Sequence, residues 1–299
     1  KHLSDNLTGV GESWEISGVE DNESVVANGP DKGLTLTDMV RKYRGELVGE
    51  ENYARFGNKF PLLIKFIDAK QDLSIQVHPN DELAKKRHNS MGKTEMWYIL
   101  DCEPDSFLYF GVNKEITKEE FERRIQDNTL LDVLKAVPVH KGDVFFIKSG
   151  TIHAIGAGIQ ICEIQQNSNT TYRVYDFGRV GKDGKPRELH IQKAIDVSNL
   201  SPIESDFKPC GPEEKNGDCD TVRLATCEYF TTYESTLNGT TTLHVDDESF
   251  GSILLIEGSA TIENNGTTLE VNKGDSVFID ANSGDVKITG NCQWIYSRV

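Results

Sequence analysis

The chain has 299 residues, of which 37% are hydrophobic and 27% are charged, which is the balance of a globular protein with a buried core. Its 32 basic and 48 acidic residues give a net charge of −16, and such a surface repels phosphate backbones, so we expect no nucleic-acid partner. No apolar run approaches the roughly 20 residues that span a bilayer, so we expect no membrane partner either. A small anion is still an acceptable ligand, because a few cations in a pocket outweigh surface charge that salt screens within about 10 Å.

Six cysteines are spread along the chain without a CxxC pair. A chain of this length does not need disulfides to hold its core, so we predict reduced thiols and a cytoplasmic location. Cys210 and Cys219 bracket a polar loop that a disulfide or a zinc site would also explain. We interpret them as two unrelated thiols.

In chain order, the first predicted element is a helix, because apolar residues recur at helical spacing between residues 36 and 47. Short strands separated by Gly, Asn and Asp turns follow, which is typical of a β-sandwich or barrel. The clearest of these strands are predicted at residues 60–68, 72–79, 95–100, 143–148 and 158–166.

A second helical segment is predicted at residues 115–137, as an insertion between strands. Thr117 is a candidate N-cap, and Glu120 three residues later would complete a capping box. Ile116 and Phe121 occupy the positions of a hydrophobic staple.

An internal repeat organises the rest of the chain. VPVHKGDVFFIKSGTIHAI (137–155) and LEVNKGDSVFIDANSGDVKI (269–288) share the pattern V-x-KGD-x-x-FI, which in cupin barrels is a turn followed by an inward-facing strand. We therefore predict a mainly β protein with two cupin (jelly-roll) barrels in tandem. His153 occurs only in the first copy, so we expect only the first barrel to bind metal.

A polar stretch near residues 198–220 is rich in turn residues and is either a linker or a long surface loop. Taken as a linker, it gives a metal-binding cupin at residues 1–112 with 138–205 and a helical insertion at 113–137. The C-terminal cupin-like domain, without metal ligands, is then residues 206–299.

Several polar side chains share faces of the predicted strands. Ser74, Gln76 and His78 alternate along the strand at 72–79 and point to one face, as do Lys93 and Glu95 on the next strand. Each group alone is weak evidence, since an exposed polar face or a core histidine would explain it. Together, the four donors suit zinc or another first-row divalent ion; they are Gln76, His78, Glu95 and His153.

Five ordered segments carry a more specific signal. SIQVHPND, GKTEMWYIL, SGTIHAIG, EIQQNSNTTYRVYDFGR and PRELH resemble the signature segments of type I mannose-6-phosphate isomerases of the short bacterial form. GESWEIS and VANGP extend the resemblance over most of the chain up to about residue 200. Beyond about residue 206, the chain resembles only the general cupin-like C-terminal domain of those proteins.

The resemblance implies a role for each matching residue. Gln76, His78, Glu95 and His153 match the ligands of one Zn²⁺ per chain, with another divalent first-row metal as the alternative. Arg173 matches a catalytic arginine, and Ser74 and Lys93 match residues that contact the substrate at its phosphate, helped by Arg187. Glu163 matches an acidic residue of the pocket and is our first candidate base for proton transfer, with a water on the metal as the second.

The implied reaction is the interconversion of mannose 6-phosphate and fructose 6-phosphate through an enediol(ate), by an aldose-ketose isomerase that is a monomer or a homodimer. One departure is Asn169, which stands where many members have Asp and puts an acid/base role there in doubt. The alternatives are an iron-dependent cupin dioxygenase and a non-catalytic sugar-binding cupin. Lys93 and Arg173 argue against the first, because they suit an anionic substrate.

Two histidines and two tryptophans are considered for further roles. We expect His140 to face solvent, and we consider His190 as a candidate for the border of the pocket. Trp14 and Trp97 are interpreted as core residues.

Overall fold

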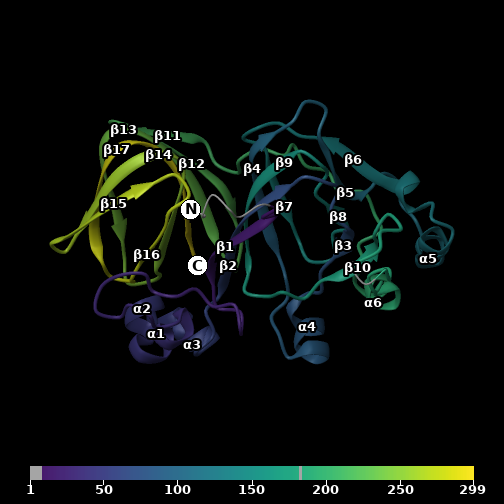
Figure 1. The fold of residues 1–299 in the computed structure, drawn as a ribbon, viewed down its shortest axis with the longest axis horizontal. Coiled ribbons are helices and arrows are strands. Elements are labelled where there is room, and N and C mark those ends of the chain that lie inside the picture. Colours follow the sequence, from purple (N-terminus) through teal and green to yellow (C-terminus); the bar gives the residue numbers. More distant parts are fainter. Residues whose placement is uncertain (1–8, 182–183) are drawn as a thin grey trace. The chain divides into compact units, whose positions relative to one another are not determined.

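The computed structural model describes residues 9–181 and 184–299. It forms two compact units: a terminal unit, which combines the chain up to Lys65 with Pro209–Val299, and a central unit, Phe66–Lys208. Both are built mainly from antiparallel strands, and the prediction of two cupin barrels in tandem is confirmed (Figure 1). Within the described residues, no helix is long and apolar enough to cross a membrane.

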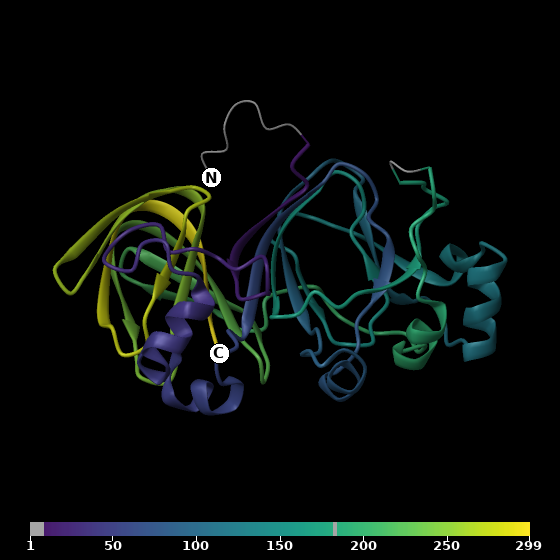
Figure 2. The same cartoon turned by 60° about the horizontal axis from the view of Figure 1, so that its bottom comes forward.

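The central unit consists of two facing sheets that curve into a barrel (Figure 2). One runs in the order β1-β2-β9-β4-β7, of which β1 (Glu12–Ser17) and the part of β2 up to Lys65 belong to the terminal unit. The other runs in the order β10-β3-β8-β5-β6. The strands are β2 (Leu62–Ala69), β3 (Ile75–Val77), β4 (Glu95–Cys102), β5 (Phe107–Val112), β6 (Leu134–Pro138), β7 (Val144–Ile147), β8 (His153–Ala154), β9 (Ile159–Gln166) and β10 (Tyr172–Tyr175). The helical elements are α4 (Asp81–His88), α5 (Lys118–Gln126), the 3₁₀ helix η1 (Leu130–Val133) and α6 (Ile191–Val197).

The five strands predicted most clearly are present as β2, β3, β4, β7 and β9. The helical insertion is shorter than predicted, because α5 ends at Gln126 and the chain enters β6 at Leu134. Thr117 does cap α5, accepting a hydrogen bond from the backbone N–H of Glu120 at 3.1 Å. The Glu120 carboxylate instead accepts from Arg124, so an i,i+4 ion pair takes the place of the capping box.

The terminal unit carries one large sheet in the order β11-β12-β13-β17-β14-β15, with β16 pairing β14. Three helices lie together beside the strands of this unit (Figures 1 and 2). Its elements are β1 (Glu12–Ser17), α1 (Leu36–Tyr43), α2 (Gly45–Val48), α3 (Glu50–Phe56), β11 (Glu213–Asn216), β12 (Cys219–Thr226), β13 (Thr231–Val245), β14 (Gly251–Asn264), β15 (Thr267–Asn272), β16 (Ser276–Ile279) and β17 (Gly284–Arg298).

The helix predicted at residues 36–47 is two helices. α1 ends at Tyr43, and Arg44 takes a positive φ of 54° before α2 begins at Gly45. A positive φ is strained for a residue with a side chain, and it ends the first helix. Thr35 caps the N-terminus of α1, since its Oγ1 accepts a hydrogen bond from the N–H of Asp38 at 3.1 Å.

The two copies of the repeat form the same turn. In the first, the backbone N–H of His140 donates to Asp143 Oδ2 at 2.7 Å; in the second, that of Asn272 donates to Asp275 Oδ2 at 2.8 Å. The glycines before these aspartates have φ of 92° and 89°, which explains why the motif needs Gly at that point. The sequence repeat is therefore a structural repeat, one copy in each unit.

Candidate active site

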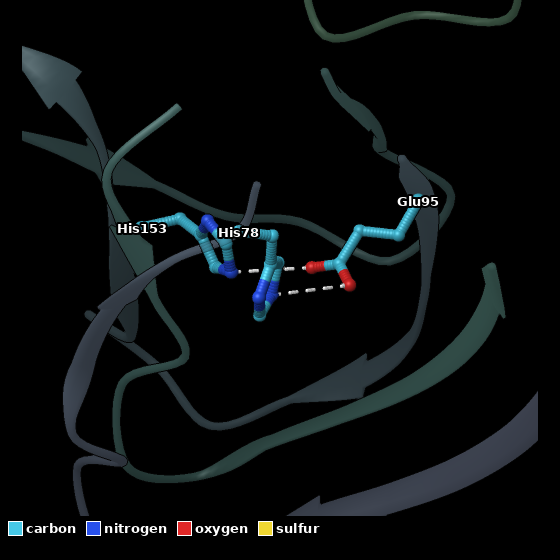
Figure 3. A group of neighbouring side chains, drawn as sticks. All are labelled: His78, Glu95 and His153. Carbon is cyan, nitrogen blue, oxygen red and sulfur yellow. Dashed lines mark ion pairs between the residues drawn. The ribbon is translucent and has the colours of Figure 1, made fainter. Parts of the chain in front are cut away.

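Two histidines and one glutamate meet inside the central barrel (Figure 3). His78 follows β3, Glu95 begins β4 and His153 begins β8. His153 Nε2 lies 3.2 Å from Glu95 Oε1, and His78 Nε2 lies 3.6 Å from Glu95 Oε2. All three side chains are buried, so the barrel places them together and away from bulk water.

The backbone fixes which nitrogen of each imidazole faces the others. His78 Nδ1 lies 3.1 Å from the carbonyl oxygen of Thr170, and His153 Nδ1 lies 2.8 Å from that of Thr151. A carbonyl oxygen only accepts hydrogen bonds, so Nδ1 carries the hydrogen in both rings and Nε2 presents a lone pair to the centre. This is the tautomer that a metal ligand needs.

The donor atoms of this group fit a bound metal ion. Among the described residues, both Nε2 atoms and both oxygens of Glu95 are buried without a hydrogen-bond partner. Buried polar atoms normally have partners, so these four atoms are suited to bind a ligand such as a metal ion. Two ligand atoms bound tetrahedrally at about 2.1 Å are about 3.4 Å apart, which lies between the two observed separations.

The electrostatics of the group agree with this role. Burial and the nearby Lys93 ammonium hold the pKa of His78 well below its usual value, so its ring is neutral at pH 7. Burial by itself raises the pKa of Glu95, but Lys93, His78 and His153 outweigh it, and the net pKa is lowered. A neutral imidazole and an ionised carboxylate are the forms that bind metal.

Gln76, the fourth predicted ligand, lies in β3 between the strands of two other site residues. It pairs with His153 in β8 and with Arg173 in β10. Directly paired residues extend their side chains from the same face of a sheet, so all three point the same way.

A second carboxylate, Glu163, lies beside the first. It is buried in β9, and its Oε2 accepts a hydrogen bond from Trp97 Nε1 at 2.8 Å. The buried Lys93 ammonium lies between the two carboxylates, 3.2 Å from Glu95 Oε2 and 3.9 Å from Glu163 Oε1. Trp97 is fully buried, and its ring also meets that of His153 edge-on, with centroids 5.3 Å apart.

Arginines gather at β10 and in the segment after it. Arg173 Nη1 donates to the carbonyl of Glu188 at 2.9 Å, while its Nε is buried without a partner among the described residues. Arg187 makes two hydrogen bonds to the carboxylate of Asp176, at 2.7 and 2.6 Å, and Arg179 also donates to it. Burial alone raises the pKa of Asp176, but both arginines lower it more, so the carboxylate is ionised and offsets part of their charge.

The remaining predicted residues divide between the interior and the surface. Ser74 is buried just before β3, and His190 Nδ1 accepts a hydrogen bond from the backbone N–H of Arg173 at 3.0 Å. His140 is exposed, as predicted, and Asn169 is exposed too. The six cysteines are free thiols, which confirms their interpretation as unpaired.

Two features of this region were not identified from the sequence. Trp97 was assigned to the core alone, although it donates to Glu163 from the directly opposite position on β4. Gln165 was not singled out, although it pairs with Glu95 across the same two strands. The strand register carries both signals, and it is not visible before the strands are paired.

Comparison with known proteins shows which family the chain belongs to. The family described as phosphomannose isomerase type I, catalytic domain, matches residues 4–103, and the mannose-6-phosphate isomerase cupin domain matches residues 220–299. A probable mannose-6-phosphate isomerase of Bacillus subtilis, GmuF, is 40% identical over 96% of this chain and 89% of its own length. The chain belongs to the type I phosphomannose isomerase family.

Further relatives extend this result to the structure. The mannose-6-phosphate isomerase ManA of the same organism is 39% identical over 97% of this chain and 89% of its own. A crystal structure of a mannose 6-phosphate isomerase from Bacillus subtilis matches with a TM-score of 0.88 and 34% identity, covering 97% of this chain and 90% of that one. As a member of the phosphomannose isomerase family the chain is an isomerase, and neither the dioxygenase nor the non-catalytic alternative is favoured.

Proposed function

We propose that this phosphomannose isomerase interconverts mannose 6-phosphate and fructose 6-phosphate by moving a proton between C1 and C2 through an enediol(ate). The observation that carries the proposal is the buried group of His78, Glu95 and His153, with the second carboxylate of Glu163 next to it. The facing atoms of this group lack hydrogen-bond partners within the part of the chain that the structure describes. Family membership supports mannose 6-phosphate as one of the two substrates, because the relatives are named for it.

The metal is proposed to be Zn²⁺, one ion per chain, held by Gln76, His78, Glu95 and His153. Two imidazoles with two oxygen donors suit zinc, although other first-row divalent ions accept the same set. When bound, the ion would act as a Lewis acid on the oxygens of the substrate, where negative charge develops.

Glu163 is the residue we propose to move the proton. Trp97 holds one of its oxygens, and Lys93 lies near the other, so the carboxylate has a fixed direction inside a dry site. Glu163→Gln keeps the shape and removes the base, so we expect kcat to fall about 100-fold or more with metal content unchanged. Turnover near that of the wild type would remove Glu163 from this role.

The cations of the site are proposed to bind and stabilise the anionic substrate. Arg173 would place a guanidinium next to the developing negative charge, and its buried Nε supports a ligand there. Ser74 and Lys93 are proposed to contact the phosphate. Arg187 is proposed as a weaker contact, since Asp176 already occupies two of its donors.

The chemistry is proposed to belong to residues 1–112 with 138–205, with 113–137 as a helical insertion and 206–299 as a cupin-like domain without metal ligands. The match of the catalytic-domain family to residues 4–103 supports this, whereas by packing the chain up to Lys65 belongs to the terminal unit. Six free thiols support a cytoplasmic location. A monomer or a homodimer is proposed.

The experiment that tests the proposal is isomerase turnover of mannose 6-phosphate before and after chelation, followed by zinc add-back. We expect chelation to abolish turnover and zinc to restore it, because the facing atoms of His78, Glu95 and His153 have no hydrogen-bond partner among the described residues. An inactive protein with metal demonstrably bound would overturn the proposed reaction.

A further inference from the structure

Gln165 brings a neutral hydrogen-bond acceptor to the proposed metal ligands. It lies in β9 directly opposite Glu95 in β4, and its side chain is fully buried. Side chains of directly opposite residues leave the same face of the sheet, with Cβ atoms about 5 Å apart. Gln165 therefore extends toward the interior that holds Glu95.

The orientation of this amide is fixed by its own backbone. Nε2 of Gln165 donates to the carbonyl oxygen of Gln166 at 2.8 Å and to that of Ser168 at 2.6 Å. Turning the amide over would place Oε1 against these two acceptors, which would repel it. Oε1 is therefore the free end, and it is buried without a hydrogen-bond partner among the described residues.

We propose that Gln165 accepts a hydrogen bond from a hydroxyl group of the sugar substrate, at C3 or C4, away from the carbons that exchange the proton. This inference rests on the proposed function, because it names a contact of the same substrate. A buried acceptor with both amide hydrogens already donated still needs a donor group or a cation to satisfy it, and a sugar hydroxyl is such a donor. Of the groups on a sugar phosphate dianion, only the hydroxyls donate.

The neighbouring residue provides a matched control. Gln166 is also buried, but both ends of its amide are occupied: Oε1 accepts from the backbone N–H of Thr94 at 2.8 Å, and Nε2 donates to Asp81 Oδ1 at 2.9 Å. Gln165→Met and Gln166→Met thus remove an amide of the same size from adjacent positions. Only the first removes an acceptor that lacks a partner.

The test compares mannose 6-phosphate with its 3-deoxy and 4-deoxy analogues on the zinc-loaded enzyme. We expect wild-type kcat/KM to fall about 10- to 100-fold for one of the two analogues, since the buried acceptor then stays unpaired. In Gln165→Met, the ratio of kcat/KM for mannose 6-phosphate to kcat/KM for that analogue should approach one, because the acceptor is gone for both substrates. Gln166→Met should keep the wild-type ratio, even where its folding or overall rate suffers.

Several outcomes would overturn the inference. If the wild-type enzyme turned over both analogues as fast as the parent sugar, the inference would be overturned by the wild type alone. A misfolded Gln165→Met therefore does not leave the question open. Unchanged discrimination in a folded Gln165→Met would place the hydroxyl contact on another residue. Absence of any turnover of mannose 6-phosphate by metal-loaded wild type would overturn the proposed function itself, which is a different result.

Discussion

The same strand arrangement occurs once in each unit. In the central unit, β4 pairs with β7 on one side and with β9 on the other; in the terminal unit, β14 pairs with β16 and with β17. The repeated turn anchors both. The backbone N–H of Ile99 donates to the carbonyl of Asp143 at 3.0 Å, and that of Leu255 donates to the carbonyl of Asp275 at 3.0 Å.

Counting back from these anchors identifies equivalent positions. Glu95 lies opposite Ile147, and its counterpart Gly251 lies opposite Ile279. A side chain at Gly251 has no room, because a Cβ there would lie 2.8 Å from the ring of Tyr296. The ring of a tyrosine thus fills the space that Glu95, a proposed metal ligand, occupies in the other unit.

The second carboxylate is replaced in the same way. Trp97 lies opposite Glu163, while its counterpart Ile253 lies opposite Tyr296. Ile253 and Tyr296 are members of the buried apolar cluster of the terminal unit. The difference shows that one strand arrangement accommodates buried carboxylates in one unit and apolar packing at the equivalent positions of the other.

The largest effect, on bound metal and isomerase turnover, is expected from replacing Glu95, whose counterpart in the terminal unit is Gly251. Glu95→Gln takes away the carboxylate that faces both imidazoles, so we expect bound metal to be lost and isomerase turnover to fall about 1,000-fold or more. Metal analysis of the purified protein and the isomerase assay measure this. Glu257→Gln, at an exposed ion pair of the terminal unit, is the control and should change neither quantity. Full metal content in Glu95→Gln would contradict the proposed ligand set.

A smaller effect is expected from the tyrosine in the terminal unit. Burial raises the pKa of Tyr296 to about 12, from about 10 in an unfolded chain. The folded state therefore keeps the phenol protonated while the unfolded state ionises, so this stability is complete below pH 10 and is lost as pH rises toward 12. Two pKa units correspond to roughly 2–3 kcal/mol.

Urea unfolding between pH 9 and pH 12 measures this loss. We expect the free energy of unfolding of the wild type to fall more steeply over that range than that of Tyr296→Phe, which cannot ionise. The buried Cys292 thiol, whose pKa burial raises to about 11, contributes to both proteins and cancels in the difference. Parallel slopes for the two proteins would mean that Tyr296 is accessible to solvent in the folded state.

Local sequence patterns predicted much of this molecule. Alternation along residues 72–79 placed Gln76 and His78 on one face, and the repeated KGD turn located both barrels, because a strand period and a turn depend on near neighbours in the chain. The triad of His78, Glu95 and His153 followed from those elements together with the family resemblance. These parts required no knowledge of which strands pair.

What the sequence did not predict depends on pairing between distant residues. The hydrogen bond from Trp97 to Glu163 and the position of Gln165 opposite Glu95 follow from the register of β4 and β9. The helix ends predicted at residues 137 and 47 were wrong, since α5 ends at Gln126 and α1 at Tyr43. Local propensity does not show where tertiary packing or a strained residue such as Arg44 stops a helix.

The smallest expected effect is on kcat, at Trp97, where the terminal unit has Ile253. It would show whether the Trp97 indole positions Glu163 or only packs in the core. Trp97→Phe keeps an aromatic ring in the core but removes the N–H that holds Glu163 Oε2 at 2.8 Å. One lost hydrogen bond to a buried carboxylate corresponds to roughly 1.5–3 kcal/mol, so we expect kcat to fall about 10- to 100-fold with metal content and KM near those of the wild type.

The matched control is Trp294→Phe, which makes the same change at a buried tryptophan in the apolar cluster of the terminal unit. It should lower the free energy of unfolding through lost packing and leave kcat unchanged. If Trp97→Phe behaved in the same way, with reduced stability and full kcat, the indole would be a packing residue like its counterpart Ile253. A loss of kcat confined to Trp97→Phe would instead show that the central barrel uses a core side chain to aim its base, because stability alone does not distinguish the two tryptophans.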